Sequence, residues 1–198
     1  LSSTHLVTPA VDITNFINLE LGQPMHAFDA DHIEGKIEVR LGRAGETAQL
    51  LGAATEVVVP ENAIVIADQV KILAIAGVMG CESSKSTEAT KRVYLESAVF
   101  DPISVRKTAR ALGISSLAST RFERGGDPEL AINALPRARM LFAAAGWQQV
   151  NKTWVSTSPV AAPVSLVLEL AALNSFFAAS FTGDELAALL TRYGFVCT

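Results

Sequence analysis

His26 is the residue best suited to acid–base or positioning chemistry, because it lies among apolar residues in the run Gln23-Pro24-Met25-His26-Ala27-Phe28-Asp29. An imidazole can accept or donate a hydrogen bond near neutral pH. The ordinary interpretation is a partly buried histidine that caps a helix end or fills the edge of a core. Judged on the residues alone, catalysis is the rarer role for a histidine in such a run.

Glu96 is a second candidate, because it interrupts the apolar run Val93–Phe100. In strict strand alternation it shares a face with Tyr94 and Ala98. The commoner interpretation is a carboxylate on a solvated strand face. The alternative is a buried carboxylate, which needs hydrogen-bond donors that a ligand can supply.

A glycine- and serine-rich segment, Gly77–Ser84, is predicted to be a loop between two strands. Its glycines allow backbone N–H groups to approach a ligand. It matches neither the dinucleotide fingerprint nor the phosphate-binding P-loop, so a plain tight turn is the default. Ser115, Ser116 and Ser119 lack a Gly-x-Ser-x-Gly elbow, which argues against a serine nucleophile.

Composition narrows the class of protein. The 198 residues are 49% hydrophobic, which suits one globular domain plus a smaller unit. Two distant cysteines and three histidines show no zinc-binding spacing, so no metal is expected. The formal net charge of −4 argues against a general DNA or RNA binder. No secretory signal or bilayer-length apolar stretch is recognised, so we expect a cytoplasmic location without membrane contact.

The elements that must position these residues begin with a helix. Thr8 caps it, Pro9 takes its first position, and Gly22 with Pro24 ends it, so the motif containing His26 is predicted to be a loop. Short β-branched or apolar runs predict strands at Lys36–Leu41, Thr55–Val59, Ala63–Ala67, Lys71–Ala76 and Val93–Val99.

Two further helices begin with an Asp-Pro pair, at Asp101 and Asp127, and end at Gly113 and Gly146. The segment between them, Ile114–Gly126, is predicted to be a polar loop. Ser156–Pro163 is predicted to be a linker. Beyond it we expect a strand at Val164–Leu168 and helices at Glu169–Ala179 and from Thr182 to Tyr193-Gly194.

Three stretches carry a family resemblance. Val11–Phe16 continuing through Leu19–Asp29 resembles the signature of the tRNA-editing module, the B3/B4 domain, of bacterial phenylalanyl-tRNA synthetase beta subunits. Tyr94–Ala98, and Arg121–Gly125 followed by Asp127-Pro128, are similar to later parts of that module in the same order. The resemblance covers residues 1–155 as the editing domain, with a linker at 156–163. Residues 164–198 resemble the start of the following, B5-like domain.

The resemblance implies hydrolysis of the ester in tyrosyl-tRNA(Phe). It places Glu96 where the family reads the tyrosine hydroxyl. His26 corresponds to the editing-site histidine, which positions the terminal adenosine of the tRNA or the attacking water. Ser116 joins them as a catalytic residue at a position where the family often has threonine. Ala118 leaves room for the aromatic ring, and the backbone of Gly77 and Gly80 lines the pocket.

Two departures from the family pattern favour an alternative. His5 stands where the family usually has an arginine that contacts substrate, and Cys81 replaces a common glycine. A cysteine at a position that requires positive φ needs a reshaped loop. The alternative is a structural, tRNA-positioning module with decayed editing.

The family also implies partners and a fold. The partners are the 3′ end of tRNA(Phe) and a catalytic alpha subunit, in a heterotetramer. ATP and Mg²⁺ serve the whole synthetase, and this chain needs no cofactor of its own. We expect an α/β (α+β) fold with mixed β-sheets covered by helices. The sheets form two intertwined subdomains with a cleft between them, and a short helical carboxy-terminal piece follows.

Overall fold

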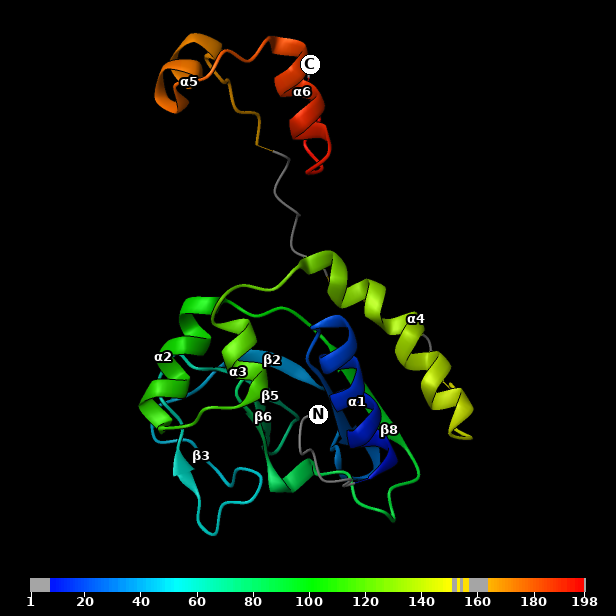
Figure 1. The fold of residues 1–198 in the computed structure, drawn as a ribbon. Coiled ribbons are helices and arrows are strands. Elements are labelled where there is room, and N and C mark those ends of the chain that lie inside the picture. Colours follow the sequence, from blue (N-terminus) through cyan, green and yellow to red (C-terminus); the bar gives the residue numbers. More distant parts are fainter. Residues whose placement is uncertain (1–7, 151–152, 154, 157–163, 198) are drawn as a thin grey trace. The chain divides into compact units, whose positions relative to one another are not determined.

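The computed structural model of the chain describes residues 8–150, 153, 155–156 and 164–197. It divides into two units, Leu1–Trp154 and Val155–Thr198. The helices and strands of the first unit are α1 (Pro9–Leu21), β1 (Met25–Asp29), η1 (Ala30–His32), β2 (Glu38–Leu41), β3 (Thr47–Ala48), β4 (Val57–Val58), β5 (Ile64–Ala67), β6 (Ile72–Ile75), β7 (Met79–Gly80), η2 (Glu82–Ser84), β8 (Val93–Ser97), α2 (Pro102–Leu112), α3 (Leu117–Phe122) and α4 (Pro128–Ala144). Figure 1 shows their arrangement.

Helix α1 has the ends that the sequence predicts. The Thr8 side chain accepts a hydrogen bond from the Val11 N–H, and Pro9 needs no partner for its nitrogen. Gly22 ends the helix at φ 79°, a left-handed conformation that favours glycine, and its N–H donates to the Asn18 carbonyl. The buried residues of the helix include Ile17, which is fully inaccessible to solvent.

The motif that follows α1 is a strand, so the predicted loop at Gln23–Asp29 is wrong from Met25 onward. Strand β1 pairs antiparallel with β8, with Met25 opposite Ser97 and Asp29 opposite Val93. Its partner lies far along the chain, and the turn residues near Gly22 gave no sign of it. The buried Gln23 amide fastens the start of the ribbon by donating to the Ala98 carbonyl at 2.9 Å.

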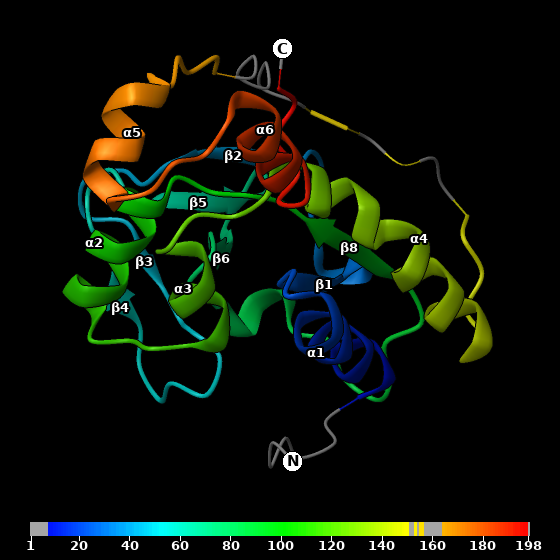
Figure 2. The ribbon, with the colours of Figure 1, turned by 45° about the horizontal axis from the view of Figure 1, so that its top comes forward.

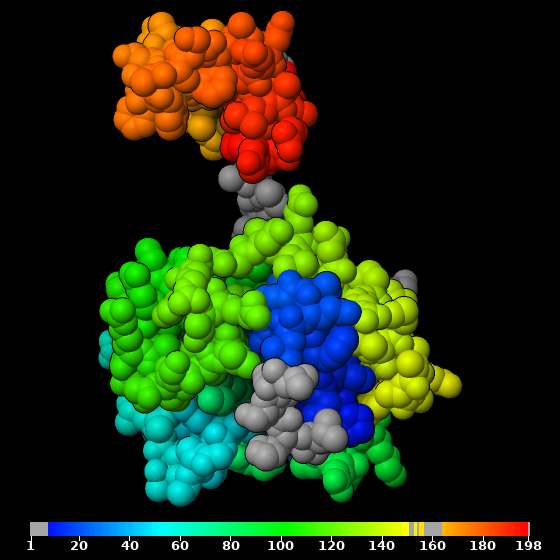
Figure 3. Space-filling model, in the orientation of Figure 1, coloured from blue at the N-terminus to red at the C-terminus, as the bar shows by residue number. Residues whose placement is uncertain are grey.

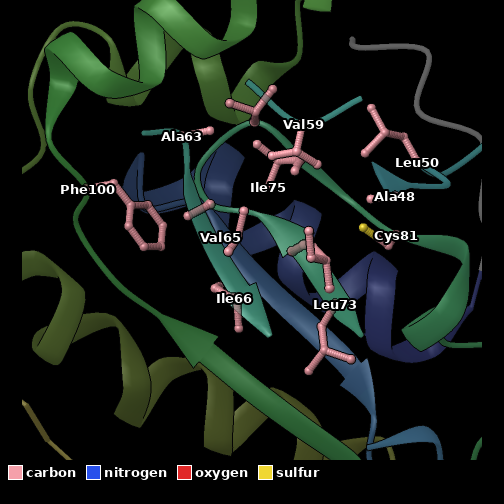
Figure 4. Close-up of a cluster of buried hydrophobic side chains, with 14 of the residues drawn as sticks. Ala48, Leu50, Val59, Ala63, Val65, Ile66, Leu73, Ile75, Cys81 and Phe100 are labelled. Carbon is pink, nitrogen blue, oxygen red and sulfur yellow. The ribbon is translucent and has the colours of Figure 1, made fainter. Parts of the chain in front are cut away.

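The second sheet has the strand order β2-β5-β6-β7, and all its pairs are antiparallel. One face packs against α2 and α3, which contribute Val105 and Phe122 to a large core. Figure 4 shows that core, in which Val65 and Ile66 of β5 lie close to Leu73 and Ile75 of β6. The predicted strand ranges at 36–41, 55–59, 63–67 and 71–76 each contain one of the observed strands.

Helices α2 and α4 begin at the predicted Asp caps, Asp101 and Asp127. The predicted loop between them is wrong, because it contains helix α3. Ser116 and Ser119 form a capping box in which each side chain accepts from the backbone N–H of the other. A serine in place of the usual glutamate at the third position hides this signal in the sequence.

The β1–β8 ribbon separates two cores. One face carries Ala27 and Leu95, which pack against α1 and α4. The other face carries Phe28, which belongs to the large core under α2 and α3. Helices α1 and α4 lie side by side, joined by a bidentate ion pair between Arg137 and Glu20 (Figures 2 and 3).

The second unit contains helices α5 (Leu170–Phe177) and α6 (Gly183–Thr191), near the predicted ranges. The predicted strand at Val164–Leu168 is wrong, since these residues form no ladder and Val167 is 98% exposed. β-branched composition without a pairing strand does not make a strand. The predicted linker at 156–163 lies outside the described residues except for Ser156.

The predicted α/β class, with sheets covered by helices, is confirmed, and every described strand pair is antiparallel. Within the described residues, each helix is too short or too polar to span a bilayer.

Candidate functional site

A cavity of about 330 Å³ opens in the first unit. Its walls come from α1, from the β1–β8 ribbon, from the turn between β6 and β7, and from the start of α3. All the described site residues that the sequence predicts line this cavity, namely His26, Gly77, Gly80, Glu96, Ser116 and Ala118. The remaining predicted site residue, His5, lies outside the described residues.

His26 and Glu96 are brought together by the ribbon. They are direct partners in the β1–β8 register, so both side chains project from the same face. Residues opposed in this way typically have Cβ atoms about 4.5–5.5 Å apart. His26 and Glu96 form no ion pair with each other or with another described residue. The two ionisable groups therefore share the cavity without neutralising one another.

The His26 ring lies at the edge of the cavity and packs against a neighbouring aromatic ring. Its centroid lies 4.4 Å from that of Phe28, in an edge-to-face arrangement at 63°. Burial lowers the pKa of the imidazole from 6.5 to about 4, so the ring is neutral at pH 7. The interpretation as a core-edge histidine fits this packing, and the interpretation as a helix cap does not, since His26 lies within a strand.

The Glu96 side chain is half-buried and borders the cavity, so neither interpretation of the sequence, a solvated carboxylate or a fully buried one, describes it completely. Burial raises its pKa from 4.5 to about 7. No described residue forms an ion pair or a side-chain hydrogen bond with it that would offset this burial. A partly buried carboxyl group without a partner is stabilised by a hydrogen-bond donor that enters the cavity.

Gly77 and Gly80 form the tight wall opposite the ribbon. The segment predicted as a loop contains the turn Ala76–Val78 and then strand β7. Gly77 has φ 69°, and a Cβ there would lie 3.0–3.1 Å from side-chain atoms of Val105, Phe100 and Phe122. A Cβ at Gly80 would lie 2.6 Å from the His26 Cε1 atom. Both glycines are needed for close packing, and Gly77 also for its left-handed backbone conformation.

Cys81 does not need the reshaped loop that the sequence comparison suggested. Its φ is −107°, an extended conformation that any residue adopts. The side chain is 1% exposed and packs in the large core, where burial raises the pKa of the thiol to about 12. Cysteine therefore fits this position without backbone strain.

Ser116 ties the start of α3 to the glycine turn. Its hydroxyl donates to the Val78 carbonyl at 2.8 Å, and its oxygen accepts from the Ser119 N–H at 3.0 Å. The hydroxyl proton is therefore held by a backbone carbonyl of the protein. Ala118 is the second residue of α3 and borders the cavity with a single methyl group. The arrangement supports an ordered wall more directly than a serine nucleophile.

The α1 wall was missed by sequence reasoning. Thr14, Asn15 and Asn18 line the cavity with Val11. The spacing of Thr14 and Asn18 was an available signal, since residues four apart share a helix face and these two sit among apolar neighbours. The buried Asn18 is 6% exposed, and its Oδ1 atom has no hydrogen-bond partner among the described residues.

A larger cavity, of about 640 Å³, lies against α4 and is lined from β8 by Val93 and Leu95, on the ribbon face away from His26. It contains none of the predicted site residues. Within the described part of the chain, no group of three or more His, Cys, Asp or Glu side chains is placed to hold a metal ion. The described residues that the sequence predicts to form the site line the smaller cavity instead.

Comparisons with known proteins give consistent matches to one family. A family model described as the B3/4 domain matches residues 2–146. The phenylalanine–tRNA ligase beta subunit of Idiomarina loihiensis is 38% identical over 196 residues, covering 98% of this chain and 24% of that protein. The protein of the same name from Legionella pneumophila strain Paris is 41% identical over 192 residues, covering 96% and 24%. The chain therefore spans about a quarter of the length of these curated relatives.

Among solved structures, an N-terminal fragment of the phenylalanyl-tRNA synthetase beta-subunit from Pyrococcus horikoshii matches with a TM-score of 0.50 and 16% identity. The match covers 91% of this chain and 54% of that one. At this identity the likeness concerns the fold alone.

Proposed function

Because the chain belongs to the B3/4 domain family, we propose that it is part of a phenylalanine–tRNA ligase beta subunit and carries an editing site that hydrolyses tyrosyl-tRNA(Phe). Support for the first part comes from the names of relatives such as those of Idiomarina and Legionella. Support for the second comes mainly from one observation. Glu96 borders the cavity opposite His26, half-buried and without a hydrogen-bond or ion-pair partner among the described residues.

The editing task follows from the physics of selection. An apolar site shaped for phenylalanine rejects an isostere with one added hydroxyl by only about a hundredfold. A second site can invert this selection by forming a hydrogen bond to the phenol. A phenylalanyl ester leaves that polar group unpaired, and discrimination of this kind reaches about 10⁴–10⁵.

Glu96 supplies the acceptor for the phenol in this proposal. The rest of the cavity wall is rich in apolar groups, including Ala118, Phe100 and Phe122, which suit an aromatic ring. A phenol O–H that donates to the carboxylate stabilises the ionised form of Glu96. Burial destabilises the ionised Glu96 carboxylate when the cavity is empty. The same burial therefore favours binding of a phenol, which supplies the missing hydrogen bond.

His26 positions the attacking water. The water oxygen forms a bond to the ester carbonyl carbon, and the bond from that carbon to the ribose oxygen breaks. The ribose oxygen takes a proton, and free tyrosine and uncharged tRNA leave. A neutral imidazole can accept a hydrogen bond from the water, but a pKa of about 4 makes it a weak base. Placement of the water therefore contributes more than proton removal.

A non-hydrolytic module that positions tRNA is the second candidate. The observation in its favour is that the Ser116 hydroxyl donates to the Val78 carbonyl, so this predicted catalytic residue serves the wall. In either case the proposed partners are the 3′ end of tRNA(Phe) and a catalytic alpha subunit. ATP and Mg²⁺ would serve that subunit, no cofactor is assigned to this chain, and the location would be the cytoplasm.

The test is deacylation of tyrosyl-tRNA(Phe), with phenylalanyl-tRNA(Phe) as the control substrate. We expect fast release of tyrosine, a loss of at least about a hundredfold in Glu96→Gln, and little release of phenylalanine. Glu38→Gln is the matched control, because Glu38 is an exposed carboxylate on β2. Release of tyrosine at the uncatalysed rate from the unmutated protein would rule out the hydrolase and leave the positioning module.

A further inference from the structure

The α1 wall of the cavity contains a buried amide that the protein does not satisfy. Asn18 is 6% exposed, it borders the cavity, and no described residue donates to its Oδ1 atom. Unpaired buried polar groups are rare in folded proteins and are costly to keep. An apolar side chain of the same size would avoid that cost, so the amide calls for a function.

The other polar groups of the cavity show which ligand chemistry it suits. The Thr14 hydroxyl donates to the Val11 carbonyl at 2.8 Å, and the Ser116 hydroxyl donates to the Val78 carbonyl. Both hydroxyl donors are thus turned to the backbone. Glu96 and Asn18 offer acceptor oxygens, and the remaining side-chain donors include the Asn18 amide nitrogen and one His26 ring N–H. None of the described lining residues is a lysine or an arginine. With two acceptor groups that lack partners among the described residues and no cationic side chain in its described wall, the cavity suits a ligand that brings a positively charged donor.

We propose that Asn18 accepts a hydrogen bond from the α-ammonium group of the aminoacyl ester, and so restricts the site to esters whose amino group is free. This inference rests on the proposed editing function. A tyrosyl ester has two strong donors, the phenol and the ammonium, and Glu96 engages the phenol. The terminal torsion of asparagine is broad and roughly twofold, so the Asn18 oxygen can turn towards an entering donor.

The substitution that tests this is Asn18→Leu, which keeps the size of the side chain and removes the amide. For tyrosyl-tRNA(Phe) we expect kcat/KM to fall about 10- to 100-fold, the range for a hydrogen bond to a charged group. For N-acetyl-tyrosyl-tRNA(Phe), which lacks the ammonium, the unmutated protein should already be slow. Asn18→Leu should then change its rate by less than about twofold, since the bond to a charged donor is already lost.

Thermal stability distinguishes this role of Asn18 from a purely structural one, because loss of a structural amide would lower the Tm. Asn18→Leu should raise the Tm by about 2–6 °C, because an unpaired amide is removed and leucine is the better helix former. Gln23→Met is the matched control. Gln23 is a buried amide that donates to two carbonyls, those of Pro24 and Ala98, and its loss should lower the Tm.

A binding experiment separates failure of this inference from failure of the editing proposal. The probe is a non-hydrolysable amide, 3′-tyrosylamino-adenosine, measured by calorimetry with and without an N-acetyl group. Asn18→Leu should weaken the free-amine probe at least about tenfold and leave the acetylated probe unchanged. An equal loss for both probes, no loss for either, or a lowered Tm would overturn the role of Asn18. Tight binding without deacylation would instead refute the hydrolase.

Discussion

The pH dependence of stability tests whether partial burial of Glu96 raises the pKa of its carboxyl group. Its pKa is 4.5 as an ordinary carboxyl and about 7 in the folded protein. Each pKa unit corresponds to about 1.4 kcal/mol, so the difference amounts to at most about 3 kcal/mol. The folded state holds this proton more tightly than the unfolded state. Its contribution to stability is therefore fully present below pH 4.5 and is lost as the pH rises through about 7.

His26 acts with the opposite sign. Its pKa falls from 6.5 to about 4 on folding, so the unfolded state takes up a proton that the folded state refuses. Its contribution is present above pH 6.5 and is lost as the pH falls towards 4, again by at most about 3 kcal/mol. The windows of the two groups overlap almost completely. In the unmutated protein their effects should largely cancel between pH 4.5 and 6.5.

The assay is urea denaturation of the unmutated protein, Glu96→Gln and His26→Gln from pH 4.5 to 8. Relative to the unmutated protein, Glu96→Gln should gain up to about 3 kcal/mol between pH 4.5 and 7. Relative to the same reference, His26→Gln should lose stability over the range in which His26 normally supplies it, and the loss should grow with pH. The reasoning is refuted if either difference is independent of pH, because a fixed difference reports packing alone.

Three further predictions concern the cavity walls. Gly80→Ala should push the facing imidazole aside and abolish deacylation, while Gly183→Ala, where a Cβ meets nothing within 4 Å, should leave activity unchanged; unaltered activity in the first variant would contradict the close contact. Ser116→Ala should lower the free energy of unfolding by about 1–2 kcal/mol, since a helix cap and a tie to the turn are lost, whereas the exposed Ser115→Ala should have no effect by the same urea measurement. The preference for tyrosyl over phenylalanyl ester should rise as the pH increases from 6 to 8 and Glu96 ionises; a preference that is flat across this range in deacylation assays would argue against Glu96 as the phenol acceptor.

The helix ends were predictable because their determinants are local. Thr8, Asp101 and Asp127 each cap a helix whose first residue is a proline, and each contact spans at most three residues. Strand ranges in the middle of the chain were predictable for a similar reason, since apolar runs between turn residues need little context. Helix α3 was missed because its capping box uses Ser119 instead of an acidic or amide residue.

The site was predictable in its residue types and not in its geometry. Residue type and context singled out His26 and Glu96, and the resemblance gave them roles, but only the pairing of strands about 70 residues apart shows that they face one another. For Glu96, alternation correctly gave the companions on its face, yet it does not tell whether that face meets water or another layer. Asn18 was missed because the absence of a hydrogen-bond partner is a property of the whole surrounding structure.

The two-faced β1–β8 ribbon constrains how this sequence can change. Alternate residues of each strand belong to different environments, the core under α1 and α4 on one side and the cavity on the other. Deleting or inserting one residue inside either strand would turn Ala27 and Leu95 into the cavity and press His26 and Glu96 into the core. Apolar substitutions on the core face need only preserve volume. The lengths of these two strands should therefore tolerate less variation than the identities of most of their residues.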